Sequence, residues 1–236
     1  MIILISWSGE MKQVERAVIL AAGLGTRLKW LTHGRPKALM QVAGLPAIAH
    51  VTRSLVRQGV RDIVVNVHHH AEQMRSFLGD GSRFGCRISI SYEPVLLDSG
   101  GGVKQALTLL PGDGPFAVWN ADVLSDIDVQ AMTTLLPEAG VVIALVANPA
   151  HHPDGDFVLD HAVVRAGGDE RFTFSGVSVW HPDGFAAHNV GDVYSLTVPM
   201  RARIAEGRCA GVMHRGQWFD IGRPRDLMQA NRMMGS

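Results

Sequence analysis

The sequence is poor in cysteine and carries no net charge, and each shortage excludes a class of protein. Its only two cysteines among 236 residues, Cys86 and Cys209, have the spacing of neither a disulfide framework nor a metal motif. They are predicted to be reduced, buried thiols of a cytoplasmic protein. The 22 basic and 22 acidic residues cancel. No global basic field is therefore available to hold nucleic acid, and any phosphate recognition must be local.

Long apolar runs are also lacking. The apolar stretch MIILISW at the N-terminus is too short for a membrane span, and no basic region precedes it as in a signal peptide. We therefore expect no membrane partner. Residues 1–15 are predicted to be a flexible extension, with Met1 or Met11 as the initiating residue. Residues 16–236 are predicted to form a single domain, because 47% hydrophobic residues suffice for one sizeable core.

The chain does contain an alternation of apolar strands and helical segments. In the first half, strands are predicted over 17–22, 62–67, 87–92 and 116–119, and helices over 46–57, 71–78 and 103–110. This order predicts an α/β fold with a Rossmann-like open, mostly parallel sheet flanked by helices. Ligands of such sheets lie beyond the carboxyl ends of the strands. The glycine loop at Gly23 and the strand-end residue Asp122 are therefore expected to meet.

The second half of the chain predicts a smaller, mixed β layer. Its expected strands cover 141–146, 156–159, 161–165, 172–180 and 218–221, and its expected helices cover 196–206 and 224–233. No repeat or linker separates the halves, so we expect them to fold together.

The most specific motif is the string LAAGLGTR at residues 20–27, followed by Pro36 and Lys37. Its two glycines permit backbone conformations that turn amide groups onto a phosphate. Arg27 can bind phosphate oxygens through two donors, and Lys37 adds a compact charge. A lone Gly-x-Gly equally fits a tight strand–helix turn. The whole string is neither a Walker motif nor a dinucleotide fingerprint.

This string resembles the signature of the sugar-1-phosphate nucleotidyltransferases. The resemblance runs from about residue 17 to 231 through the strings LDSGGG (97–102), WNAD (119–122), GDF (155–157), FTFSG (172–176) and WFDIG (218–222). Trp30 departs from the family, which usually has proline there. The resemblance implies the GT-A-like nucleotidyltransferase fold, with the mixed β layer binding the sugar.

Two aspartates are candidates for a metal site. Asp122 directly follows a predicted strand, and Asp220 lies in the WFDIG string. A strand-end aspartate is often a helix cap, but Asp128 is available for that role. Magnesium takes one or two carboxylates and completes its shell with water and phosphate. The resemblance assigns Mg²⁺ to both residues. The histidine run 68–70 is not expected to bind metal, because adjacent histidines converge poorly.

The resemblance also implies roles for other residues. Expected catalytic residues are Arg27, Lys37 and Asp122. Expected nucleotide-binding residues are Ala22, Gly23, Gly25, Thr26, Arg27, Lys37, Glu93, Gly100 and Gly101. Expected sugar-binding residues are Asn120, Asp156, Ser175 and Gly176. Glycines 100–102 fit either a platform for a flat base or the close packing of a helix start, and each sugar-binding residue fits equally a structural polar group.

The expected reaction is transfer of UMP from UTP to a sugar 1-phosphate, with N-acetylmuramate 1-phosphate as the acceptor and cell-wall recycling as the setting. The partners are thus a nucleoside triphosphate and a sugar 1-phosphate, without nucleic acid. The lactyl carboxylate of muramate calls for a cation, for which Arg83, Arg165 and Arg171 are candidates. Guanylyl or thymidylyl transfer to another hexose 1-phosphate is an alternative. A non-catalytic nucleotide-sugar sensor is another.

Overall fold

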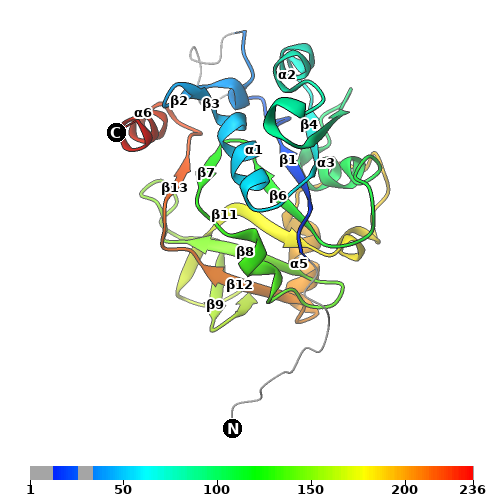
Figure 1. The fold of residues 1–236 in the computed structure, drawn as a ribbon. Coiled ribbons are helices and arrows are strands. Elements are labelled where there is room, and N and C mark those ends of the chain that lie inside the picture. Colours follow the sequence, from blue (N-terminus) through cyan, green and yellow to red (C-terminus); the bar gives the residue numbers. More distant parts are fainter. Residues whose placement is uncertain (1–12, 26–33, 236) are drawn as a thin grey trace.

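The computed structural model describes residues 13–25 and 34–235 (Figure 1). Within them, nine strands form one sheet in the order β5-β4-β1-β6-β11-β8-β12-β10-β9. Their bounds are β1 Arg16–Leu20, β4 Asp62–Val67, β5 Arg87–Tyr92, β6 Phe116–Asn120, β8 Val141–Val146, β9 Phe157–Asp160, β10 Val163–Arg165, β11 Arg171–Trp180 and β12 Cys209–Met213. Two short ribbons pair β2 (Gln41–Val42) with β3 (Leu45–Pro46), and β7 (Val123–Ser125) with β13 (Trp218–Asp220).

The helices cover both faces of this sheet. They are α1 Ala47–Arg57, α2 Ala71–Leu78, α3 Asp98–Ala106, α4 Val129–Thr133, α5 Thr197–Ala205 and α6 Pro224–Met234. Buried side chains of α1, α2, α4 and α6 belong to one apolar cluster, and those of α3 and α5 belong to another. No helix in the described ranges is both long and apolar enough to cross a membrane.

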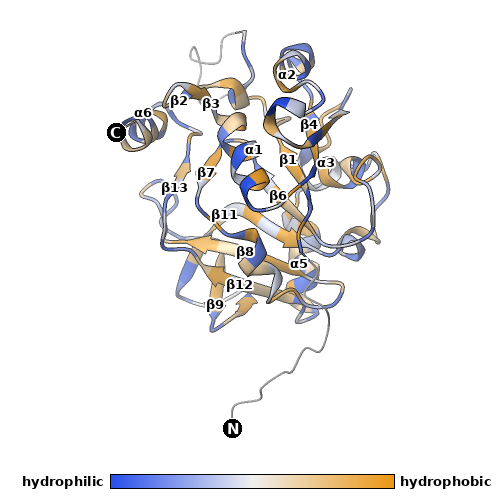
Figure 2. Ribbon diagram, viewed as in Figure 1, coloured by the Kyte–Doolittle hydropathy of each residue, from blue (hydrophilic) through white to orange (hydrophobic). Residues whose placement is uncertain are grey.

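The first half of the sheet is parallel, as predicted. Strand β1 pairs in parallel with β4 on one side and with β6 on the other, and β5 extends the sheet beyond β4. Successive residues of β1 alternate between the two apolar clusters, with Val18 in one and Ala17 and Ile19 in the other. Both faces of β1 are thus buried, which explains its run of apolar residues (Figure 2).

The second half forms the expected mixed β layer, and its strands continue the same sheet and close on themselves. Strand β11 pairs antiparallel with β6, β8 and β9, while β8 pairs in parallel with β12. Strand β10 then joins β12 to β9, so five strands form a ring. A Cβ added at Gly211 would lie 2.7 Å from Val164 Cγ2 and 2.8 Å from Leu159 Cδ1. The glycine therefore allows the ring to close tightly.

Two predicted boundaries need correction. Residues 1–12 of the expected extension lie outside the described residues, but Val14 is fully buried and its amide donates to Gln130 Oε1 at 3.0 Å. The folded body thus begins by residue 14 rather than at residue 16. Helix α3 begins at Asp98 instead of residue 103, so the glycines 100–102 lie inside the helix and not in a loop before it.

Close packing explains why α3 contains these glycines. The amides of Gly100 and Gly101 donate to the carbonyl oxygen of Tyr194 at 2.9 and 3.1 Å. A Cβ added at Gly100 would lie 2.5 Å from the Tyr194 ring, and one at Gly101 would overlap the carbonyl oxygen of Asp192. The helix start is therefore docked directly against the segment 192–195.

We expect Gly101→Ala to lower the free energy of unfolding by about 1–3 kcal/mol, the usual effect of overpacking. The backbone of Asp192 would have to move to admit the new methyl group. Urea unfolding followed by circular dichroism measures the change. Gly167→Ala is the matched control, because a Cβ there meets nothing within 4 Å. Equal unfolding midpoints for the two variants would contradict the packing explanation.

Candidate active site

The glycine loop and Asp122 lie at the same edge of the sheet, as predicted. Leu20 and Asn120 face each other at the carboxyl ends of the parallel strands β1 and β6. Beyond them, the amide of Ala121 donates to the carbonyl oxygen of Leu20 at 2.9 Å. The segment that leads to Gly23 is thus tied to the segment that leads to Asp122, although about a hundred residues separate them in the sequence.

The two candidate metal ligands are brought together by the β7–β13 ribbon. In its register Asp220 faces Val123, the residue after Asp122, and the Ile221 amide donates to the Asp122 carbonyl at 2.9 Å. The Lys37 ammonium forms an ion pair with Asp122. At Gly222, an added Cβ would lie 2.8 Å from Asp220 Oδ1 and 3.2 Å from Lys37 Nζ. Glycine at 222 therefore leaves the space into which these charged side chains converge.

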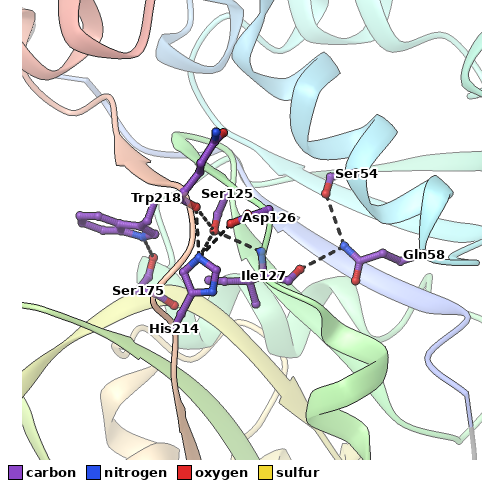
Figure 3. A network of polar contacts seen from close by, with 9 residues as sticks. Ser54, Gln58, Ser125, Asp126, Ile127, Ser175, His214 and Trp218 are labelled. Atoms are coloured by element: carbon purple, nitrogen blue, oxygen red, sulfur yellow. Dashed lines mark hydrogen bonds and ion pairs between the residues drawn. The ribbon is translucent and has the colours of Figure 1, made fainter. Parts of the chain in front are cut away.

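Polar side chains fasten the ribbon to the rest of the molecule (Figure 3). The Trp218 indole donates to the carbonyl oxygen of Ser175 at 2.9 Å, which joins β13 to β11. At the same end of the ribbon, where Trp218 pairs with Ser125, His214 Nε2 lies 3.0 Å from Asp126 Oδ1 and 3.3 Å from Ser125 Oγ. These bonds hold the strand that carries Asp220 at a fixed distance from β7. Asp126 thus helps to hold the ribbon in place, and its side chain remains exposed.

The Asp128 side chain has the capping role expected of it. Its Oδ1 accepts hydrogen bonds from the amides of Gln130 at 2.9 Å and Ala131 at 3.0 Å, at the start of α4. Asp122 is therefore not needed as a helix cap.

The pKa of Asp220 is raised above its ordinary value. The main cause is burial, and the neighbouring Asp122 carboxylate adds to it. Lys37, the Gly222 amide and His151 each lower the pKa and offset part of the effect. Two carboxylates held together in a partly buried site repel each other, and this repulsion favours the protonated acid. A bound cation relieves the same repulsion.

This arrangement fits a hard divalent cation. The described residues contain no cluster of three or more His, Cys, Asp or Glu side chains that could enclose a metal by itself. Two convergent carboxylates are instead the donor set with which magnesium is commonly held when substrate phosphates complete its shell. Asp122 and Asp220 would supply those oxygens.

In the described part of the glycine loop, Gly25 has the conformation expected of a glycine and Gly23 does not. Gly25 has φ of +63°, a left-handed conformation that favours glycine. A Cβ added at Gly23 would meet nothing within 4 Å, so packing against the protein does not require glycine there. Ala22 is 7% exposed and anchors the loop base. Thr26, Arg27 and Trp30 lie outside the described residues.

A buried polar chain that the sequence did not indicate supports this loop. The Ala21 amide donates to Asn66 Oδ1 at 2.7 Å, and Asn66 Nδ2 donates to Glu93 Oε1 at 2.7 Å. Glu93 Oε2 then accepts from the Leu97 amide at 3.0 Å, and its side chain is fully buried. Glu93 therefore positions the segment before α3. The structure does not bring its carboxylate to the open edge of the sheet.

The expected sugar-binding residues fall into two groups. Asn120 and Gly176 are adjacent, since a Cβ added at Gly176 would lie 2.6 Å from Asn120 Nδ2. Gly176 has φ of +84° and lies where the β11 register shifts between Phe174 and Ser178. The Ser175 hydroxyl is buried and accepts from the Val177 amide at 3.1 Å. Its side chain therefore forms the turn beside Asn120.

Asp156 forms the second group. Its Oδ2 accepts from the Phe174 amide at 2.8 Å, and its Oδ1 lies 3.0 Å from His152 Nε2. The carboxylate thereby ties the start of β9 to β11. Its side chain remains 36% exposed.

The three arginines considered for the lactyl carboxylate are engaged elsewhere. The Arg83 guanidinium lies over the rings of Phe77 and Phe84, with its carbon 4.1 and 4.7 Å from their centroids. Arg165 forms an ion pair with Asp160, and Arg171 donates to the carbonyl oxygen of Gly168. A cavity that adjoins Asp220 is instead lined by Arg223 and Arg225, which the sequence analysis did not select. The sequence feature that could have indicated these two arginines is their position directly after the WFDIG string.

Comparison with known proteins gives a consistent result. The nucleotidyl transferase family model matches residues 16–157. Two proteins named N-acetylmuramate alpha-1-phosphate uridylyltransferase are similar over nearly the whole chain. The Neisseria meningitidis serogroup B protein is 40% identical over 94% of this chain and 99% of its own. The Caulobacter vibrioides protein is 36% identical over 91% and 94%, respectively. An inositol-1-phosphate CTP transferase structure from T. maritima shares the fold, with a TM-score of 0.79, 17% identity, and coverage of 95% of this chain and 96% of that one.

We expect Asp220→Asn to stabilise the metal-free protein at neutral pH. Because its pKa is raised in the folded state, Asp220 holds its proton more tightly there than in the unfolded chain. Wild-type stability should therefore fall as pH rises from the ordinary aspartate pKa to the raised one, and asparagine escapes this loss. Urea unfolding with a chelator from pH 3 to 8 measures the difference, with the exposed Asp169→Asn as control. If Asp220→Asn were less stable than wild type at pH 7, the result would contradict the repulsion between Asp122 and Asp220.

Proposed function

We propose that this chain, which belongs to the sugar-1-phosphate nucleotidyltransferase family, transfers UMP from UTP to N-acetylmuramate 1-phosphate and releases pyrophosphate. The observation that carries the proposal is the convergence of Asp122, Asp220 and Lys37 beside the glycine loop. The near full-length similarity to two N-acetylmuramate alpha-1-phosphate uridylyltransferases supports the choice of base and sugar. We further propose that the reaction takes place in the cytoplasm, within peptidoglycan recycling.

The reaction would be an in-line displacement at the α-phosphorus of the nucleotide. A phosphate oxygen of the sugar 1-phosphate attacks, and the bond to pyrophosphate breaks. The attacking phosphate is ionised at neutral pH, so the chain need not supply a general base. Its contribution is to position the two substrates and to neutralise their charge.

Asp122 and Asp220 would hold Mg²⁺ through their carboxylate oxygens. When bound, the ion supplies charge neutralisation and orientation to the phosphates. Lys37 contacts Asp122 directly, so its ammonium would be available to neutralise charge on the α-phosphate. From the sequence, Arg27 and the amides of Gly25 and Thr26 would hold the β- and γ-phosphates, together with Ala22 and Gly23.

The base and the sugar would lie on opposite sides of this charged centre. The α3 start, with Gly100 and Gly101, would border the base, and Glu93 would position that border from within the core. Asn120, Gly176 and the Ser175 turn would border the sugar. Asp156 retains enough exposure to accept from a sugar hydroxyl or an acetamido N–H.

Pyrophosphate release tests this proposal. The protein is incubated with Mg²⁺, one of five nucleoside triphosphates, and N-acetylmuramate, N-acetylglucosamine, glucose or mannose 1-phosphate. We expect rapid release with UTP and the muramate substrate, and at least a hundredfold loss in Asp122→Asn because a metal ligand is removed. Asp169→Asn is the matched control, because Asp169 is exposed and lies outside the residues assigned to the site.

The outcomes separate the alternatives. Release with GTP or dTTP and another hexose 1-phosphate would keep the chemistry and reject the proposed base and sugar. No release with any pair, together with retained nucleotide-sugar binding, would indicate the non-catalytic sensor.

Lys37→Gln should lower kcat about 10²- to 10³-fold, the effect of removing one preorganised donor to developing charge, about 2.7–4 kcal/mol. Because Lys37 occupies an oxygen of Asp122, its removal should leave the affinity for Mg²⁺ undiminished. Steady-state kinetics across a magnesium titration measures both effects. Lys104→Gln serves as control, since the Lys104 ammonium donates to the carbonyl oxygen of Phe185. A higher magnesium requirement with unchanged kcat would show that Lys37 only shapes the metal site.

A further inference from the structure

A cavity of about 530 Å³ adjoins Asp220. It lies between the loop that follows β8, strand β13 and the first turns of α6. The polar or aromatic side chains that line it include His151, Trp218, Arg223, Arg225 and Asp226. Figure 1 shows β13 leading into α6 at this side of the molecule.

The two arginines of this cavity have no protein partner within residues 13–25 and 34–235, where Arg87, Arg165 and Arg203 each pair with a carboxylate. Neither guanidinium forms a hydrogen bond, an ion pair or a ring contact in that part of the chain. Both are exposed, and Arg223 directly precedes the first turn of α6. The free amides of a helix start add to the positive potential of such side chains.

The charges around the cavity favour an anion. Asp220 and Asp226 are its acidic residues. The metal proposed above would neutralise Asp220, which leaves Asp226 opposed by the two arginines. A guanidinium group presents a planar pair of donors that matches a carboxylate.

The cavity also adjoins the residues expected to bind the sugar. Trp218, one of its walls, donates to the carbonyl oxygen of Ser175 at 2.9 Å. Ser175 precedes Gly176, which lies against Asn120. Another wall, the loop with His151, continues directly to Asp156. A substituent on a sugar held by Asn120 and Asp156 would therefore have this cavity as a neighbour.

We propose that Arg223, with Arg225 beside it, binds the carboxylate of the acceptor's lactyl substituent and so selects N-acetylmuramate over N-acetylglucosamine. This inference rests on the proposed function, because it takes the acceptor from there. The two sugars differ only by the lactyl group. A comparison between them therefore isolates the contact with the carboxylate.

Calorimetric titration with UDP-N-acetylmuramate and with UDP-N-acetylglucosamine, in Mg²⁺, tests the subsite without turnover. A hydrogen-bonded charge pair corresponds to roughly a ten- to hundredfold difference in Kd. We expect wild type to prefer the muramate compound by such a factor. Arg223→Ala should lose most of the preference by weakening muramate binding alone, Arg225→Ala should lose less, and Arg223→Lys should retain part of it.

Arg232→Ala is the matched control, because Arg232 lies in the last turn of α6 and does not line the cavity. Thermal unfolding of each variant shows that the fold is retained. Equal affinity of wild type for both compounds would overturn the inference, and so would an undiminished preference in Arg223→Ala. Failure of the proposed function would appear separately, as absence of pyrophosphate release from N-acetylmuramate 1-phosphate and UTP.

Discussion

The repulsion between Asp122 and Asp220 is the constraint on which the rest of the site depends. Two carboxylates in a partly buried place would separate unless the backbone held them together, and their proximity adds to the burial that raises the pKa of Asp220. The β7–β13 ribbon supplies that restraint, and Lys37 supplies one compensating charge. The folded protein therefore carries an unfavourable charge pair that a cation relieves. The proposed divalent ion and substrate phosphate would make the interactions that the protein alone leaves unmade.

The two halves of the sheet position different parts of this site. The parallel half places the glycine loop after β1 and Asp122 after β6, because parallel neighbours end at one edge. The antiparallel strand β11 then brings its register shift and Gly176 against Asn120. Strand β11 also pairs with β8 and β9 of the five-strand ring, and these pairings fix its position. The segments proposed to bind phosphate and sugar are thus positioned by one continuous hydrogen-bonded sheet. A local shift in either half would therefore also move the side chains of the charged centre.

Periodicity and motifs predicted the parallel half well, because β1, β4 and β6 are mostly buried and apolar, and β5 alternates between apolar and polar residues. The start of α3 was missed because three glycines indicate a loop by propensity, whereas the docking of segment 192–195 overrides that preference. Strand β12 was missed because Gly211 interrupts its pattern. The convergence of Asp122 with Asp220 followed from the family resemblance. The support from Asn66 depends on long-range contacts that no local pattern contains.

In the proposed arrangement, the metal ligand Asp220 and the selectivity residue Arg223 lie on one turn of the chain. Two residues, Ile221 and Gly222, separate it from Asp220, and Gly222 must stay small for Lys37 to approach. Pro224 then begins α6, so the direction of the Arg223 side chain is set by the same turn that sets Asp220. A change that moved the arginine by altering this turn would also move the metal ligand. Substitution of the Arg223 side chain can therefore change the selectivity for the sugar without changing the reaction. Rearrangement of the backbone at this turn would affect both.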